Sequence, residues 1–435
     1  MKLTITLFIS LLLCSSVLAQ QMELDTTDHA IRLSIKEKLK ARFEIEKKQL
    51  EKEFPRRMGK KMISLVDRKE QRLYKYLDKK QLTFDSRFTS FTNKMVEELK
   101  NSNAELKNRD LITLISLNPI PNALSLGNDI IIINLGLFTF MDNREEVAAV
   151  IAHELAHNVL MHGKKNVIDR VRKDEELSAQ QRTKNIKKSK YNTYEQAFDE
   201  LRELMYSNGK KNRLEEKEAD SLGYVLAKRS GLRGINFLSS LEKLAAIDSL
   251  PEIELEEHIY KKVFDLPNLP FKDEWLKMES FDEYAYGNYK EKLEKDSLKS
   301  HPETVERIKH VKMLFPELTN DSIETTTTDD SFLALSRLAY HASIPNLYFL
   351  ESYGISTYRS LYRLTKYPEN DFYKKWLGKN FRAMYEAKKS YRLNRYVQRL
   401  NVEKQSPSLQ RFLNFIWNLR LEEIETIANH YDPKE

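Results

Sequence analysis

Residues 145–157 of the chain read Glu-Glu-Val-Ala-Ala-Val-Ile-Ala-His-Glu-Leu-Ala-His. The two histidines, His153 and His157, are four positions apart, and on an α-helix side chains with that spacing project from one face. They can therefore present two ring nitrogens to one metal ion, at about 2.0–2.1 Å if the ion is zinc. Glu154 is offset by one position, so it is placed to reach a water on the ion rather than the ion itself.

The residues around this stretch predict a single semi-buried helix. Asp142 and Glu145 have the spacing of an N-terminal capping box, and Gly163 stands where a helix usually stops. Between these limits the histidines are flanked by four apolar residues: Val147, Val150, Ile151 and Leu155. The pattern His-Glu-x-x-His on a helix is the zincin signature, and it arises by chance in roughly one such chain in a hundred. The alternative is a helix with two ordinary histidines.

A zinc site needs a third protein ligand and an open fourth position for water. His162 follows His157 by five residues, whereas the metzincin pattern places its third histidine six residues on, after a glycine, so we interpret His162 as structural. Glu216 is the better candidate. On a predicted helix over residues 211–229, it shares a face with small residues that would let this helix approach the first one closely: Ala219, Gly223 and Ala227. A His-His-Glu set is typical of catalytic rather than structural zinc.

Asp220 lies one turn after Glu216 on the same face of this predicted helix. It is placed to accept a hydrogen bond from a ligand imidazole and so to fix the tautomer of that ring. A surface ion pair is an equally good interpretation of Asp220. Glu215 and Glu218 point elsewhere on the helical wheel.

Three motifs, in this order, resemble those of a known family. The first is residues 153–157, the second is Arg-Leu-Glu-Glu-Lys-Glu-Ala-Asp over residues 213–220, and the third is His301-Pro302 with Arg307 six positions after the histidine. Together they resemble the zinc peptidase family of HtpX, the CAAX prenyl proteases, the mitochondrial Oma-type proteases and the periplasmic BepA-like proteases. The resemblance covers about residues 88–315. It implies peptide-bond hydrolysis with one zinc ion per chain.

The resemblance also implies a role for each matching residue. The zinc ligands would be His153, His157 and Glu216, and Glu154 would activate water. His301 would donate a hydrogen bond to the tetrahedral intermediate, and Arg307 would support the site. Asn122 and Ala123 resemble the family's Asn-Ala pair at the substrate-binding edge, where a peptide can add as an extra strand. Leu124 departs from the family, which usually has an aromatic residue at that position.

The predicted fold class is α+β and mainly helical: a zincin-type (gluzincin) catalytic domain with a small β-sheet, flanked by helical N- and C-terminal regions. Two charged amphipathic helices separated by Pro55 form an N-terminal arm, and two β-branched runs, 110–117 and 130–133, predict strands of the sheet. Later helices are predicted over residues 332–341 and 372–389. The predicted organisation is therefore a signal peptide (1–19), a helical arm (20–84), a metallopeptidase domain (85–319) and a C-terminal helical region, repeat-like in character (320–435).

The first residues predict export. Lys2 precedes an apolar run over residues 3–13, and Val-Leu-Ala at 17–19 suits signal peptidase. An uncleaved anchor is one alternative, but the run is shorter than the ~17–25 residues that span a bilayer. Lipid attachment at Cys14 is another. Cys14 is the only cysteine, so any metal must bind through nitrogen and oxygen ligands. We expect a periplasmic protein, with a secreted or membrane-associated one as the alternatives, and no transmembrane helix in the mature chain.

The formal net charge of +7 is modest, and basic residues concentrate between Lys164 and Lys190. That stretch has no aromatic interleaving and no nucleic-acid fold signature, so we predict a mobile arm and no nucleic-acid partner. Expected substrates are proteins or peptides, among them misfolded or envelope proteins, and the C-terminal helices offer surfaces for envelope partners. The alternative from another class is a non-catalytic exported chaperone or assembly factor with a vestigial or capped zinc site.

Overall fold

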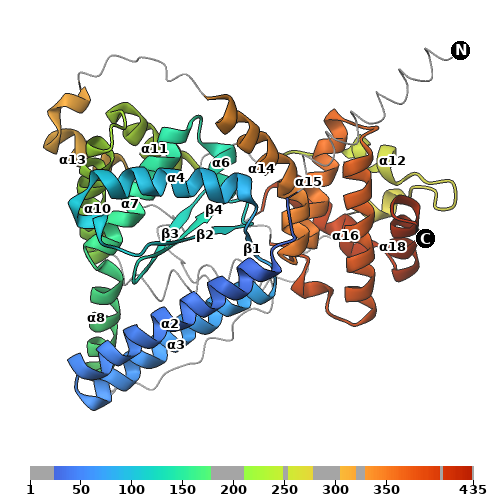
Figure 1. Ribbon diagram of the computed structural model, residues 1–435. Coiled ribbons are helices and arrows are strands. Elements are labelled where there is room, and N and C mark those ends of the chain that lie inside the picture. The colour runs from blue at the N-terminus through green and yellow to red at the C-terminus, as the bar shows by residue number, and fades with distance from the viewer. Residues whose placement is uncertain are drawn as a thin grey trace, which may run out of the picture. The chain divides into compact units, whose positions relative to one another are not determined.

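The computed structural model of the protein describes residues 24–177, 210–247, 253–277, 304–319, 329–401 and 405–433. The predicted signal peptide, the second half of the basic stretch and His301 lie outside these residues. The chain divides into two compact units (Figure 1). Unit 1 comprises residues 1–184, 198–247 and 301–343, and unit 2 comprises residues 185–197, 248–300 and 344–435.

Unit 1 is built on a four-stranded sheet with the strand order β1-β2-β4-β3. Strand β2 (Ile112–Ser116) runs parallel to β4 (Ile130–Asn134), while β1 (Leu82–Thr83) and β3 (Ala123–Gly127) pair antiparallel to their neighbours. The central strand β4 is apolar and fully buried from Ile130 to Ile133, as a strand covered on both faces must be. Strand β3 is therefore an edge strand, and only its β4 side is paired within the sheet.

Two of these strands were predicted and two were missed. The sequence indicated β2 and β4 through their β-branched residues, but β3 reads Ala-Leu-Ser-Leu-Gly, which carries no such signal. A tight turn at Asn128 and Asp129, both with positive φ, joins β3 to β4 and defines the hairpin. The sequence feature that could have indicated β3 was this turn rather than the residues of the strand.

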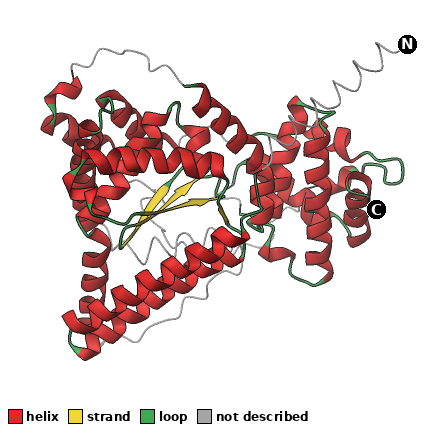
Figure 2. Ribbon diagram, in the orientation of Figure 1, coloured by secondary structure: helices red, strands yellow, loops and turns green. Residues whose placement is uncertain are grey.

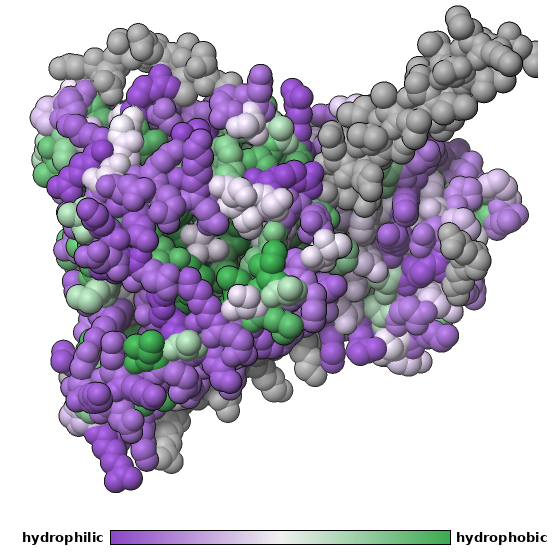
Figure 3. All heavy atoms as spheres, in the orientation of Figure 1, coloured by the Kyte–Doolittle hydropathy of each residue, from purple (hydrophilic) through white to green (hydrophobic). Residues whose placement is uncertain are grey.

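Helices surround the sheet, and Figure 2 shows how far they outweigh the strands. Helices α2 (His29–Glu53) and α3 (Arg56–Asp78) form the predicted arm, a hairpin that breaks at Pro55. The other helices of unit 1 lie between and after the strands: α4 (Ser86–Ser102), α5 (Ala104–Lys107), α6 (Gly136–Phe140), α7 (Arg144–Val159), α8 (His162–Leu177), α10 (Lys210–Arg229), α11 (Gly234–Ala246) and α13 (Thr304–Leu314). The predicted fold class, mainly helical with a small sheet, is confirmed. On the face in Figure 3, hydrophobic side chains gather between α4 and the α2–α3 hairpin, where the sheet lies in Figure 1.

Both ends of helix α7 differ from the prediction. The N-cap is Asn143, whose side chain accepts a hydrogen bond from the backbone N–H of Glu146, rather than Asp142. At the other end the helix stops at Val159, because Met161 adopts a left-handed conformation with φ 56°. The expected stop, Gly163, lies inside the next helix, α8. Helix α10 agrees with the prediction and is followed by Gly231, which has the expected positive φ of 77°.

Unit 2 is mainly helical in the part of the chain that the structure describes, with an isolated β-bridge between Leu266 and Leu269. It contains α12 (Glu257–Phe264), α15 (Tyr353–Lys366), α16 (Asp371–Lys389), α17 (Pro407–Asn418), α18 (Leu421–Tyr431) and the last residues of α14 (Asp330–Phe349). Its core includes fully buried aromatic side chains: Tyr260, Phe264, Phe381, Phe412 and Phe415. None of the helices within the described ranges is both long enough and apolar enough to cross a membrane.

Candidate metal centre

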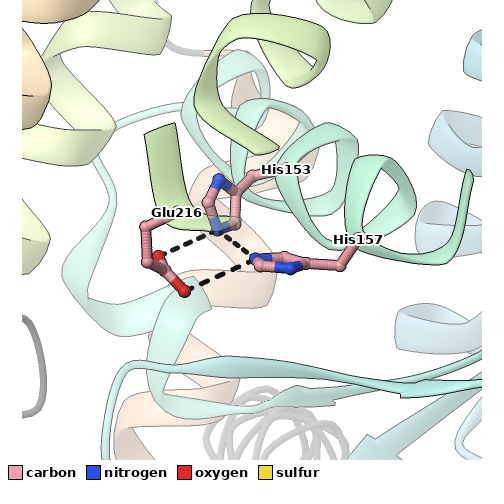
Figure 4. A group of neighbouring side chains, drawn as sticks. All are labelled: His153, His157 and Glu216. Carbon is pink, nitrogen blue, oxygen red and sulfur yellow. Dashed lines mark hydrogen bonds and ion pairs between the residues drawn. The ribbon is translucent and has the colours of Figure 1, made fainter. Parts of the chain in front are cut away.

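Figure 4 shows three side chains that converge from two helices: His153 and His157 from α7, and Glu216 from α10. The two Nε2 atoms are 3.1 Å apart. Each is 3.5 Å from one carboxylate oxygen of Glu216. Tetrahedral zinc with bonds of ~2.0–2.1 Å requires neighbouring ligand atoms to lie roughly 3.3 Å apart. Each separation is close to this value, although the two N···O contacts go to different oxygens of Glu216. With one ligand atom from each residue, all three atoms lie within 4.8 Å of one another, so the residues suit the ion.

The close approach of α7 and α10 depends on small side chains. Ala219 and Ala227 are buried, and a Cβ atom added to Gly223 would lie 2.9 Å from the Cα of His153. Real Cβ atoms essentially never come so close to backbone. A glycine at this position therefore allows the carboxylate of α10 to reach the histidines of α7, as the small-residue face of the sequence predicted.

Asp220 and Arg307 form a buried ion pair beside the ligands. Asp220 is fully buried, and its Oδ1 lies 2.9 Å from Nδ1 of His153. Arg307 donates from Nε and Nη2 to the two carboxylate oxygens of Asp220, at 2.7 and 2.6 Å, and its Nη1 lies 3.0 Å from Glu216. Asp220 thus has both contacts weighed from the sequence, an imidazole and a cation, but the ion pair is in the interior and not on the surface.

The charges of the cluster shift the pKa of each group. Burial opposes ionisation of Asp220, but the Arg307 charge outweighs it and lowers the pKa of this carboxyl to about 2. The same balance holds the pKa of Glu216 well below its usual range. Burial also opposes protonation of His153, yet its contacts with Asp220 and Glu216 raise its pKa to about 10. Burial lowers the pKa of His157 to about 3.

Glu154 faces the edge strand of the sheet. Its Oε2 accepts a hydrogen bond of 2.6 Å from the backbone N–H of Ser125 in β3. The side chain is 7% exposed, and burial raises the pKa of its carboxyl to about 7. Asn122 immediately precedes β3 and Ala123 is its first residue, and the Asn122 side chain accepts a hydrogen bond from the Ala123 N–H. The structure thus brings Glu154 beside the strand that contains the predicted substrate edge.

His162 contacts a candidate ligand, which the sequence did not reveal. It is 1% exposed, and its Nδ1 lies 2.8 Å from Nδ1 of His157. On its other side, Nε2 lies 3.0 Å from Oε2 of Glu218 in α10. The sequence indicated only that Glu218, two residues after Glu216, is turned by about 200° to another side of the helix. It gave no sign that this side faces His162. His301, the expected oxyanion donor, lies outside the described residues.

The family comparison can be set against this geometry. The sequence model of Peptidase family M48 matches residues 88–314, slightly more than half of the chain. The chain belongs to peptidase family M48. M48 is a zinc metallopeptidase family, so the predicted family is confirmed and a hydrolase is supported. The M48 match contains every candidate ligand and extends over β2 to β4 and α4 to α13. A search of curated proteins found no match.

Proposed function

We propose that this M48 protein is a zinc-dependent endopeptidase that hydrolyses peptide bonds in protein substrates. The observation that carries the proposal is the cluster of His153, His157 and Glu216, whose ligand atoms lie within 4.8 Å of one another, with Glu154 next to His153 along α7. Three protein ligands leave the fourth tetrahedral position for water, which is the arrangement of catalytic zinc. Family membership supports the same reaction class.

When bound, zinc would lower the pKa of a water molecule and polarise the scissile carbonyl. Glu154 then takes the proton from the attacking water. Burial raises the pKa of the Glu154 carboxyl in the metal-free protein, which makes the carboxylate a stronger base. Asp220 holds the ring of His153 in orientation, and Arg307 offsets the charges of Asp220 and Glu216. We assign stabilisation of the oxyanion to His301 by its resemblance to the family motif.

The substrate is proposed to bind as an extended chain along β3. This strand is the edge of the sheet, and the Ser125 N–H that it directs at Glu154 shows that its free side faces the general base. An edge strand recognises peptide backbone by pairing with it, which requires an unfolded segment. Misfolded proteins, those of the envelope among them, meet this requirement. The apolar run at residues 3–13 supports export to the periplasm.

The test is Glu154→Gln, which retains the shape of the side chain and removes its basicity. Cleavage of unfolded casein should fall by about 10² to 10⁴, with the zinc content unchanged, because loss of a general base typically costs that much. A matched control is Glu317→Gln, in which the acid contacts Lys228 of α10 and no ligand. Undiminished cleavage by Glu154→Gln would rule out the proposed mechanism.

A second candidate is a non-catalytic role as an exported chaperone or assembly factor. It is favoured by unit 2, whose helices have a core of their own and include none of the candidate metal ligands. Here the helices of unit 2 would contact envelope partners. The two candidates separate in cells that lack the protein: if Glu154→Gln restores the envelope as well as the wild type does, binding and not cleavage is the function.

A further inference from the structure

The turn between α7 and α8 places the first residue of α8 beside the metal centre. Helix α7 ends at Val159, Met161 adopts its left-handed conformation, and His162 is the first residue of α8. The side chain of His162 thereby lies between His157 of α7 and Glu218 of α10, at 2.8 and 3.0 Å. It therefore bridges the two helices that supply the metal ligands.

Only one arrangement of protons satisfies all of these contacts once His157 binds a metal through Nε2. Nδ1 of His157 must then carry the ring proton, so Nδ1 of His162 must accept it. The proton of His162 is consequently on Nε2, where it is donated to Oε2 of Glu218. We propose that His162 and Glu218 are positioning residues, which hold the His157 ring in the tautomer and orientation that zinc requires.

The proposal gives the two ligand histidines different supports. His153 is oriented by Asp220, a carboxylate that accepts two hydrogen bonds from Arg307. His157 is oriented by an imidazole, and the chain of hydrogen bonds continues to a carboxylate that is 58% exposed. Partners of this kind orient ligand rings and raise metal affinity, typically by 10- to 100-fold.

Helix α8 is fixed to α10 at a second position, which makes the bridge rigid. The buried side chain of Asn166, one turn after His162, donates to Oε2 of Glu215 at 2.8 Å. Glu215 is the neighbour of the ligand Glu216. The bridge is therefore anchored to α10 on both sides of the ligand Glu216, at Glu215 and Glu218.

The experiment measures the dissociation constant for zinc by competition with a chromophoric chelator, on the full-length protein. His162→Leu, which removes the acceptor, should weaken zinc binding by about 10- to 100-fold. His162→Asn places a carbonyl oxygen where Nδ1 stood and should recover most of that loss. The proposal is overturned if His162→Leu binds zinc within twofold of the wild type, or if His162→Asn binds as weakly as His162→Leu.

Glu218 supplies a test that does not depend on a buried substitution. Glu218→Ala should weaken zinc binding several-fold, whereas the matched variant Glu317→Ala, at another partly exposed acid that contacts α10, should leave it unchanged. Equal affinities of the two variants would count against the proposal even if His162→Leu did not fold. The inference rests on the proposed metal site. The tests are separable, because zinc affinity is measured without cleavage, and casein cleavage by Glu154→Gln is judged at full zinc occupancy.

Discussion

Replacing Glu154 by Gln should stabilise the metal-free protein, although it lowers cleavage by the zinc-bound protein by about 10² to 10⁴. The carboxyl is buried, and the hydrogen bond from Ser125 N–H at 2.6 Å can equally be accepted by the Gln carbonyl. The substitution therefore keeps the packing and this contact. What it removes is the cost of ionising a carboxyl that is shielded from water.

The size of the effect follows from the shift in pKa. Burial raises the pKa of Glu154 from 4.5 to about 7, while in the unfolded chain it stays near 4.5. Below pH 4.5 the group is protonated in both states and carries no penalty. Between 4.5 and 7 the unfolded state ionises first, so folding is penalised increasingly, and above 7 the full penalty of about 3 kcal/mol applies. Glu154→Gln should thus gain less than ~1 kcal/mol at pH 5 and about 3 kcal/mol at pH 8.5.

Urea denaturation of chelator-treated protein at these two pH values measures the gain. The three tryptophans, Trp275, Trp376 and Trp417, all belong to unit 2. Tryptophan fluorescence therefore reports unit 2, which should not change, and far-ultraviolet circular dichroism reports both units. A gain at pH 8.5 no larger than that at pH 5 would refute the reasoning. Added zinc should shrink the gain, because a cation favours the carboxylate.

Three further substitutions test other parts of the argument. Gly223→Ala should destabilise the protein by about 1–3 kcal/mol and weaken zinc binding at least tenfold, as judged by chelator competition, because the new methyl would lie 2.9 Å from the Cα of His153 and force α10 away. Arg307→Met should cost about 3–5 kcal/mol in urea denaturation without metal, since it removes the guanidinium that pairs with buried Asp220 and with Glu216, and zinc should restore part of the loss. Gly378→Ala in α16 would place a methyl 2.6 Å from the Cβ of Asp432. It should therefore lower the urea midpoint of the tryptophan-fluorescence transition and leave the zinc affinity unchanged.

The candidate ligands could be picked out from the sequence because their spacing patterns are local. The spacing of His153 and His157 fixes their common face, and the small residues near Glu216 indicate which side of α10 packs closely. The same periodicity gave the two helices of the N-terminal arm, which agree with the sequence to within a few residues. The helix propensities and the packing agree in these segments, so the pattern decides the structure.

The remaining features depend on tertiary contacts. Strand β3 has weak β propensity and exists because β4 pairs with it, so no pattern within residues 123–127 could reveal it. The end of α7 was predicted at Gly163, since glycine is the usual residue there, but Met161 takes the left-handed conformation instead. That turn places the His162 side chain beside His157. Because the turn was not predicted from the sequence, His162 could not be connected with the metal centre.

The charges around the metal centre explain why one fold can hold this site both with and without its ion. Glu154 and Asp220 are buried carboxyls, and Glu216 is 20% exposed; Arg307 pairs with Glu216 and Asp220, and His153 lies beside the same two carboxylates. Without a metal, protons on His153 and Glu154 relieve the excess negative charge: burial raises the pKa of Glu154, and the neighbouring carboxylates raise the pKa of His153 against the effect of burial. A divalent cation supplies the same two charges and requires both imidazoles to be neutral. Zinc and protons therefore compete for one site, and the general base is the group whose pKa reports which of them is bound.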